Sequence, residues 1–291
     1  MNPPTLSIII PTHNRPHLLP LAVQSALNQT FQDLEVIVVD DASIQFTKLP
    51  DDPRLRVIHL STSRGGAGAR NVGTEAARGR WISYLDDDDR LLPHMAVVSL
   101  EALSQATLPP PVGVVSGIEV INAQGQILHQ RFPPPARSRG CHFALEELEP
   151  GKSYNTKQTL VVERDVILQL GGWDETFRSR VHSELFLRLN PVCSIAGLST
   201  VTYQLYKHDE NQVSKDPLLR QRSFQQLIEK HRSTFDAHPK MFAKFVCDHA
   251  RTSYEQGQTK AAIANWLRAM QLSPQYTLNQ IAEPLRERIH R

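Results

Sequence analysis

Short, mainly apolar runs alternate with segments of helical periodicity through the N-terminal third of the chain. Each run ends at a polar turn, as a buried strand does. The predicted strands are Leu6–Ile10, Leu34–Val39, Leu55–Leu60 and Trp81–Leu85. The predicted helices between and after them are about Arg15–Leu27, Ala67–Ala77 and Pro93–Gln105. Strands that alternate with helices predict an α/β fold, with a parallel sheet and helices on both of its faces.

Polar residues follow three of these predicted strands directly. They are Pro11–Asn14, Asp40–Ser43 and Asp86–Asp89. In open α/β sheets, ligands bind outside the carboxyl ends of the strands. The three clusters are therefore predicted to converge on one rim of the sheet and to form a binding site there.

The pattern changes after about residue 105, where proline triplets bracket strand-like pieces. Val112–Ile121 and Gln126–Phe132 are predicted to form a hairpin around the turn at Asn122–Gly125. Further elements follow, with strands at Thr159–Val162 and Thr200–Leu205 and helices at Asp165–Leu170 and Ser183–Leu189.

The C-terminal segment from about Pro217 is predicted to be helical. Ala262, Trp266, Ala269 and Pro274 resemble the second helix of a tetratricopeptide unit. The match covers one repeat at most, and such repeats are usually stable only in stacks. A helical hairpin that caps the sheet domain is therefore favoured over an interaction repeat.

Composition and charge exclude several classes of function. The 291 residues are 40% hydrophobic and 21% charged, and the net charge of +2 gives no support for nucleic-acid binding. Cys141, Cys193 and Cys247 are far apart, so neither a zinc site nor a disulfide framework is predicted. The N-terminus lacks the features of a signal peptide, and no apolar run approaches the roughly 20 residues that span a bilayer. We expect a cytoplasmic protein, with peripheral association at the inner face of the membrane left open.

Four segments of the chain, in the same order, resemble family 2 glycosyltransferases. They are Ser7–Arg15 (SIIIPTHNR), Val38–Ser43 (VVDDAS), Gly68–Gly73 (GARNVG) with Gly79–Asp89 (GRWISYLDDDD), and Gly171–Glu175 (GGWDE) with Glu184–Arg188 (ELFLR). The resemblance spans roughly residues 5–210 and implies a GT-A fold, which is Rossmann-like, with a mostly parallel central sheet flanked by helices. It implies a glycosyltransferase domain at 1–214, made of a nucleotide-binding half at about 1–105 and an acceptor half at about 106–214. A C-terminal α-helical extension is predicted at 215–291.

The resemblance implies inverting transfer of a sugar from a nucleoside diphosphate sugar to an acceptor hydroxyl, with a divalent cation, Mn²⁺ or Mg²⁺. Such hard cations take carboxylate oxygens and neutralise the charge of the leaving diphosphate. Asp86 and Asp88 fit the Asp-x-Asp loop of the family, with Asp88 the best candidate for direct ligation. Asp86 or Asp87 would alternatively act through the ribose or a water. His208 fits a late histidine of the family that approaches the metal or the diphosphate.

The same resemblance assigns four further residues to the nucleotide pocket. Asp41 fits the carboxylate that reads the base, and Pro11 and His13 line the same pocket. Arg70 is a candidate contact to the diphosphate or the base, because arginine suits bidentate phosphate recognition. The alternatives are a turn-capping role for Asp41 and a surface position for Arg70. A UDP-sugar is the favoured donor.

The catalytic base is where the sequence departs from the family. The acidic pair of the family falls on Val181 and His182 when Leu185–Leu189 is aligned with the family's helix, so the expected aspartate is missing. His182 is one candidate, because its usual pKa of about 6.5 suits a base at neutral pH. Glu184, one turn further on, is the other. Trp173 is predicted either to pack on a sugar of the acceptor or to lie in the core.

Two functions of different classes follow. The first is a metal-dependent inverting glycosyltransferase that acts on a saccharide, lipid-linked or protein acceptor. The alternative is a catalytically impaired relative that binds nucleotide sugar or serves as a scaffold through its helical tail. The altered pair Val181–His182 favours the alternative, whereas the intact acidic loop argues against it. A nucleotidyltransferase would need a glycine-rich loop with Arg or Lys after the first strand, and Pro11–Pro16 is not one.

Overall fold

The computed structural model describes residues 3–207 and 216–279 of the chain. The chain divides into two compact units. The first contains residues 1–144 and 148–210, and the second contains 145–147 and 211–291. Within the described ranges, every strand belongs to the first unit, and the second unit is helical from residue 217 to residue 272.

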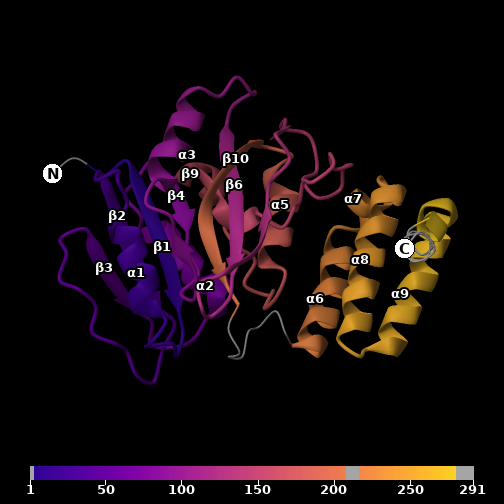
Figure 1. Ribbon diagram of the computed structural model, residues 1–291, viewed down its shortest axis with the longest axis horizontal. Coiled ribbons are helices and arrows are strands. Elements are labelled where there is room, and N and C mark those ends of the chain that lie inside the picture. Colours follow the sequence, from indigo (N-terminus) through magenta and orange to yellow (C-terminus); the bar gives the residue numbers. More distant parts are fainter. Residues whose placement is uncertain (1–2, 208–215, 280–291) are drawn as a thin grey trace. The chain divides into compact units, whose positions relative to one another are not determined.

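A mixed β-sheet forms the centre of the first unit (Figure 1). Its strands are β1 (Leu6–Thr12), β2 (Leu34–Asp40), β3 (Leu55–His59), β4 (Trp81–Tyr84), β5 (Arg90–Leu91), β6 (Val112–Ile121), β7 (Ile127–Arg131), β8 (Ala136–Arg137), β9 (Val161–Glu163) and β10 (Ser194–Tyr206). Their order is β3-β2-β1-β4-β9-β6-β10-β5, with β7 beside β6 and β8 beside β10. The first four strands are parallel, whereas β9 runs antiparallel to both β4 and β6. The predicted α/β class is confirmed.

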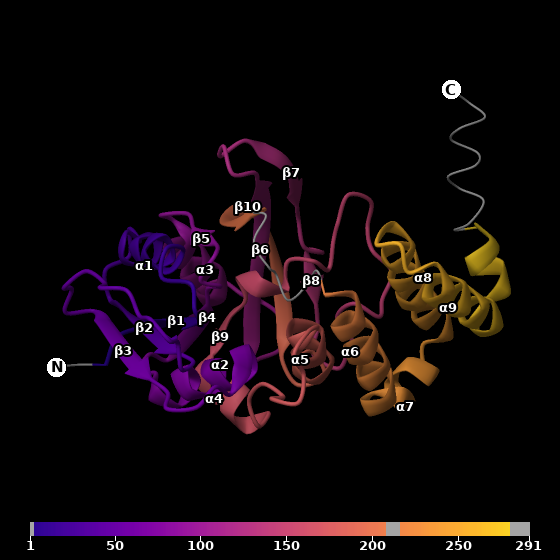
Figure 2. The same cartoon turned by 90° about the horizontal axis from the view of Figure 1, so that it is seen from below.

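Helices cover both faces of the sheet, because successive residues of a strand point to opposite sides. Ile9 of β1 packs into one hydrophobic cluster, and its neighbours Ile8 and Ile10 pack into the other. The helices are α1 (Leu19–Leu27) and α3 (Met95–Ser104) on one face, and α2 (Gly65–Ala76), α4 (Arg164–Gln169) and α5 (Val181–Leu189) on the other (Figure 2). β1 and β2 are buried along their whole length, which explains their mainly apolar sequence, and the buried Glu35 of β2 is paired with Ser7 and with arginines.

The carboxyl ends of the parallel strands lie at one edge of the sheet, which we call the rim. Thr12 at the end of β1 pairs with Asp40 at the end of β2, and Ile9 pairs with Tyr84 at the end of β4. A backbone hydrogen bond of 2.8 Å from the amide of Asp41 to the carbonyl of Thr12 joins the two loops that follow β1 and β2. The polar clusters predicted from the sequence therefore meet at this rim.

β10 is longer than its predicted core, Thr200–Leu205, because its first half mixes small and polar residues that give no strand signal. The pairing of β10 with β6 changes register between Gly197 and Val201 and again between Val201 and Tyr203. A Cβ atom at Gly197 would lie 1.8 Å from the carbonyl oxygen of Pro134. Close approach of the backbone therefore requires glycine within this strand.

The described part of the second unit is helical, as predicted for the tail. Its helices are α6 (Pro217–Lys230), α7 (Arg232–Asp236), α8 (Pro239–Glu255) and α9 (Thr259–Leu272). α8 and α9 pack together across a turn at Gly257, whose φ is +75°. The likeness to a tetratricopeptide unit stays a prediction. None of the helices in residues 3–207 and 216–279 combines the length and apolarity needed to span a bilayer.

Candidate functional site

An acidic loop, Asp86–Asp89, follows β4 at the rim. Carboxylate oxygens of Asp86, Asp88 and Asp89 all lie within 4.8 Å of one another. Carboxylates this close repel one another, and oxygen is the ligand that hard divalent cations take. These residues therefore fit Mg²⁺ or Mn²⁺. The structure thus brings together the predicted pair Asp86 and Asp88, with Asp89 as a third carboxylate to which no sequence pattern assigned a role.

Arg15 lies against the same loop from the segment that follows β1. Its Nη1 donates hydrogen bonds of 2.8 Å to Asp87 and to Asp88. The hydroxyl of Thr12 donates a further bond of 2.7 Å to Asp87. Burial raises the pKa of Asp87 to about 6, although Arg15 and Thr12 both favour its charged form. Thr12 and Arg15 therefore hold Asp87, and Arg15 also links Asp87 to Asp88.

Arg70 reaches the loop from α2 on the other side. Its Nη2 donates a short hydrogen bond to Asp86, and its Nη1 donates one of 3.0 Å to the carbonyl of Gly66. Burial would raise the pKa of Asp86, but the adjacent guanidinium outweighs burial, and the pKa lies below its usual value. Arg70 is itself buried, at 6% exposure, so the alternative of a surface position is wrong.

Asp89 fixes the far end of the loop to β10. Its carboxylate accepts hydrogen bonds from the hydroxyl of Tyr203 at 2.7 Å and from the amide of Tyr206 at 2.9 Å. Burial, with Asp88 and Asp86 close by, raises the pKa of Asp89 well above its usual value. The long strand β10 thus positions the acidic loop through residues more than 100 positions further along the chain.

Asp41 lies where β2 ends, but its carboxylate is already engaged. It accepts hydrogen bonds from the hydroxyl of Ser63 at 2.6 Å and from the amides of Arg64 and Gly65 at 2.7 and 2.8 Å. These contacts match the alternative predicted for Asp41, which caps the loop that begins α2. A carboxylate offers about four acceptor positions, so one remains for a base edge.

Pro11 and His13 belong to the same edge of the sheet. Pro11 is buried within β1, opposite Val39 of β2. Nδ1 of His13 donates a hydrogen bond of 2.7 Å to the carbonyl of Asp41, while most of the ring is exposed. The structure therefore places His13 beside Asp41, and its role in binding a nucleotide stays a prediction.

His182 and Glu184 lie in the first turn of α5 and differ in their surroundings. The His182 ring packs edge-on against Trp173, with ring centroids 5.1 Å apart. Burial and the cations Arg70 and Lys157 lower its pKa to about 3, so the ring is neutral. Both carboxylate oxygens of Glu184, in contrast, accept bonds from Arg188, at 2.7 and 2.6 Å.

Arg188 uses its remaining donors to hold a turn. It bonds to the carbonyls of Leu170 and Gly172, both at 2.9 Å, and Gly171 and Gly172 have φ values of +78° and +73°. The ion pair with Glu184 thus fixes the Gly-Gly turn that precedes Trp173. This geometry favours His182 over Glu184 as the candidate base.

The ring of Trp173 contacts both His182 and Arg70. Its ring is 2% exposed and packs edge-on against Tyr84 at 4.9 Å, with the Arg70 guanidinium 5.1 Å from its centroid. Its backbone exchanges hydrogen bonds of 2.7 and 2.9 Å with the side chain of Asn71. Burial favours the core alternative for Trp173, and contact with an acceptor stays a prediction.

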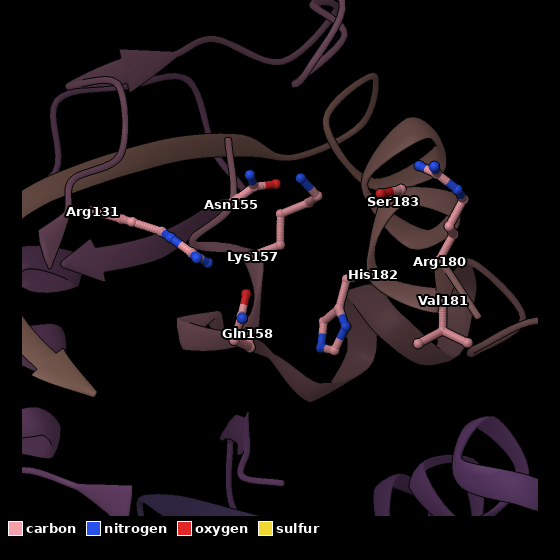
Figure 3. A pocket seen from close by; sticks show the side chains of 8 residues that line it. All are labelled: Arg131, Asn155, Lys157, Gln158, Arg180, Val181, His182 and Ser183. Atoms are coloured by element: carbon pink, nitrogen blue, oxygen red, sulfur yellow. The ribbon is translucent and has the colours of Figure 1, made fainter. Parts of the chain in front are cut away.

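A cavity of about 230 Å³ opens on the side of His182. Figure 3 shows the eight residues that line it, which are Arg131, Asn155, Lys157, Gln158, Arg180, Val181, His182 and Ser183. All of them lie between residues 131 and 183, and none comes from the rim loops after β1, β2 or β4. The cavity therefore lies within the segment that the sequence predicts to bind the acceptor, about 106–214, and that assignment stays a prediction.

Sequence reasoning missed several residues of this site, and one predicted residue lies outside the described ranges. Arg15 ends a quoted motif and Asp89 ends the acidic run, so both could have been found there. Arg131 lies in a predicted strand, but no motif gives a functional role to it or to Lys157, and only the fold brings them to His182. His208 falls in 208–215, outside the described residues.

The family model and the named relatives that match this chain are all glycosyltransferases. Residues 7–139 match the model described as "Glycosyl transferase family 2". An uncharacterised glycosyltransferase of Haemophilus influenzae is 25% identical over 79% of this chain and 78% of its own length. A GalNAc(5)-diNAcBac-PP-undecaprenol beta-1,3-glucosyltransferase of Campylobacter jejuni is 43% identical, over 31% of each chain.

Among solved structures, the chain resembles S. aureus TarS, residues 1–349, in complex with UDP-GlcNAc. The TM-score is 0.62 at 17% identity, and the match covers 95% of this chain and 83% of that one. At this identity the likeness establishes the fold alone. It confirms the GT-A fold expected from the sequence.

Proposed function

We propose, from the premise that this chain belongs to glycosyltransferase family 2, that it is a metal-dependent inverting enzyme. The substrates would be a nucleoside diphosphate sugar, with a UDP-sugar favoured, and an acceptor hydroxyl. The observation that carries the proposal is the group of carboxylates Asp86, Asp88 and Asp89 at the rim, with Arg15 and Arg70 on either side. This arrangement can hold a cation and two guanidinium groups near a diphosphate.

The residues of the rim have separate parts in this proposal. Asp88 and Asp86 would hold the divalent cation, which when bound neutralises the charge of the leaving diphosphate. Arg70 is positioned to exchange its bond with Asp86 for one to a phosphate oxygen, because guanidinium binds both in the same planar geometry. Asp41 and His13 lie beside each other, where the base would bind.

His182 is the proposed base. As the acceptor oxygen forms its bond to the anomeric carbon, the ring nitrogen takes the proton of the hydroxyl, and the bond from that carbon to the diphosphate breaks. The diphosphate leaves with the bonding electrons. The ring is neutral at pH 7 and so has a lone pair for the proton, although a pKa of about 3 makes it a weaker base than an ordinary histidine. The role therefore rests on the position of His182 beside the cavity and Trp173.

Relatives indicate the class of the substrates. The similar S. aureus protein was solved with UDP-GlcNAc and with UDP, and the Campylobacter relative is named for an undecaprenol-linked acceptor. We therefore propose a UDP-sugar donor and a saccharide or lipid-linked saccharide acceptor for this chain. Peripheral association with a membrane would suit a lipid-linked acceptor.

A second function is favoured by one specific observation. Val181 and His182 stand where the family has an acidic pair, and Glu184 is bound by Arg188. A protein that binds nucleotide sugar without transferring it would have this arrangement. Turnover separates the two functions, because only the enzyme depends on His182.

Calorimetric titration of UDP and GDP, with and without Mn²⁺, tests the proposal first. We expect UDP to bind tightly only when Mn²⁺ is present. Binding without turnover of UDP-sugars would favour the nucleotide-sugar-binding protein. If neither nucleotide bound in the presence of Mn²⁺, the proposed donor site would be wrong.

A further inference from the structure

We propose that the cavity beside His182 binds an anionic group, a phosphate or a carboxylate, that is carried by the acceptor. This inference rests on the proposed function, because it takes His182 as the group that faces the acceptor hydroxyl. Cations from three separate segments line the cavity, namely Arg131, Lys157 and Arg180. The acceptor would thus be an acidic saccharide or a phosphate-bearing one rather than a neutral sugar.

Lys157 is the strongest observation for an anion. It lies in a short 3₁₀ helix, Lys157–Thr159, and is only 6% exposed. Its ammonium group donates a short hydrogen bond to the carbonyl of Tyr154 and lies 5.8 Å from the centroid of Phe143. An ammonium group has three donors. Two of them therefore remain for a ligand in the cavity.

Within residues 3–207 and 216–279, no carboxylate balances the charge of Lys157. Arg180 acts on it and repels it. Burial and this repulsion lower the pKa of Lys157 to about 7, so an anion that entered the cavity would restore its positive charge.

Arg131 of β7 adds a second cation from the opposite wall. Its side chain is half-buried, and it makes no hydrogen bond or ion pair with any residue in 3–207 or 216–279. Burial lowers its pKa as well, again because no carboxylate opposes the loss of water. Guanidinium groups bind phosphate and carboxylate with two parallel hydrogen bonds, so this one is suited to an oxyanion.

A buried charge elsewhere in the same unit, that of Glu35, is paired within the protein. The carboxylate of Glu35, which is 1% exposed, accepts bonds from Ser7, Arg56 and Arg78. Buried charges are normally paired in this way, because an isolated one is unfavourable. Among the residues that the structure describes, Lys157 and Arg131 have no carboxylate partner of this kind, which indicates that a ligand supplies it.

The arrangement of the walls fits an acceptor. In Figure 3, Arg131 and Gln158 lie on one side of the cavity and His182 on the other, with Lys157 between them. An oxyanion held by Arg131 and Lys157 would place the saccharide that carries it next to His182. The diphosphate of the donor would bind elsewhere, since Asp86, Asp88 and Arg70 at the rim do not line the cavity.

Calorimetric titration with three matched sugars tests this proposal. D-glucose, D-glucuronate and D-glucose 6-phosphate are titrated into the full chain, first saturated with UDP and Mn²⁺. The variants are Lys157→Met and Arg131→Gln, with Lys48→Met as the control, because Lys48 is exposed and does not line the cavity. Thermal unfolding of each variant shows that it is folded, and Arg131→Gln is informative even if Lys157→Met does not fold.

We expect at least one anionic sugar to bind about 10-fold or more tightly than glucose, since hydrogen bonds to charged groups are worth that much. Lys157→Met and Arg131→Gln should each remove most of that difference, and Lys48→Met should keep it. Preference for the phosphate or the carboxylate identifies the anion. Equal binding of all three sugars, or anion binding that both cavity variants retain, would overturn the proposal. UDP that failed to bind with Mn²⁺ would instead overturn the proposed function.

Discussion

The rim and the cavity are neighbouring regions with opposite electrostatics. At the rim, the acidic loop is matched by cations, because Arg15 bonds to Asp87 and Asp88 and Arg70 bonds to Asp86. In the cavity, Lys157 makes its hydrogen bond to a carbonyl group instead of a carboxylate. The rim therefore has its counter-charges built into the protein, whereas Lys157 and Arg131 have no carboxylate partner among the described residues.

This difference indicates how each region would bind its ligand. Ligands at the rim would exchange partners, because arginines that now bind carboxylates can turn to phosphate oxygens while a cation takes the carboxylates. A ligand bound by Lys157 and Arg131 would displace no carboxylate of the described residues, and would instead provide the missing negative charge. His182 lines the cavity and packs against Trp173, which also contacts Arg70 of the rim, so the proposed base is linked to both regions.

The largest effect is expected from Asp88→Asn. It removes one proposed metal ligand at the rim and leaves the cavity unchanged. Metal-ion stabilisation of a leaving diphosphate is worth several kcal/mol, so the turnover rate should fall at least about 10³-fold. Mn²⁺ should also no longer increase the affinity of the protein for UDP. Steady-state transfer and calorimetry measure the two effects, with Asp51→Asn, an exposed aspartate outside the site, as the control. Unchanged Mn²⁺-dependent UDP affinity in folded Asp88→Asn would exclude Asp88 as a metal ligand.

His182→Ala tests the proposed base, which is linked to both regions. General base catalysis contributes about 10²- to 10⁴-fold to a rate. Turnover should fall by that factor, while the affinity for UDP with Mn²⁺ stays the same. Single-turnover transfer together with UDP titration distinguishes the two quantities. A variant with full turnover would show that another group takes the proton.

Glu184→Gln should change stability more than chemistry. It removes the charged partner of Arg188 in a buried ion pair, and losing one partner of such a pair costs about 3–5 kcal/mol. The free energy of unfolding by urea should fall accordingly, whereas Glu101→Gln on the exposed side of α3 should leave it unchanged. If Glu184 were the base, the folded variant would lose its turnover instead.

Lys157→Met tests whether the charge of Lys157 is unpaired, unlike the charges at the rim. The test is the pH dependence of the free energy of unfolding. The pKa of Lys157 is lowered from 10.5 in the unfolded chain to about 7 in the folded protein, so the unfolded state binds more protons between these values. Stability should therefore rise with pH across this window, by about 2 kcal/mol from about pH 7 to about pH 9 relative to the variant. The penalty of the buried charge is fully present below pH 7, where Lys157→Met should be the more stable protein.

Urea unfolding of both proteins at several pH values measures this difference, and Lys48→Met serves as the control. A constant difference in the free energy of unfolding across the window would show that Lys157 keeps an ordinary pKa in the folded state. In that case its charge would have a partner, and the contrast with the rim would be lost.

The local sequence predicted the N-terminal half of the fold closely. β1, β2 and β4 are apolar runs bounded by polar turns, and each was found within two residues of its predicted ends. Such strands are specified locally, because burial on both faces demands continuous apolar sequence. The antiparallel insertion of β9 between β4 and β6 has no such signal, since pairing partners far apart in the chain leave no local pattern.

What the sequence determined by itself was the rim, including Asp86 and Asp88, because motif residues that follow parallel strands must meet at one edge. Only the tertiary structure decided which charges are paired there and which are not. Arg15 and the acidic loop are more than 70 residues apart, and Arg131, Lys157 and His182 come from three different elements. Whether a charge has a partner depends on these long-range approaches, which no pattern along the chain encodes.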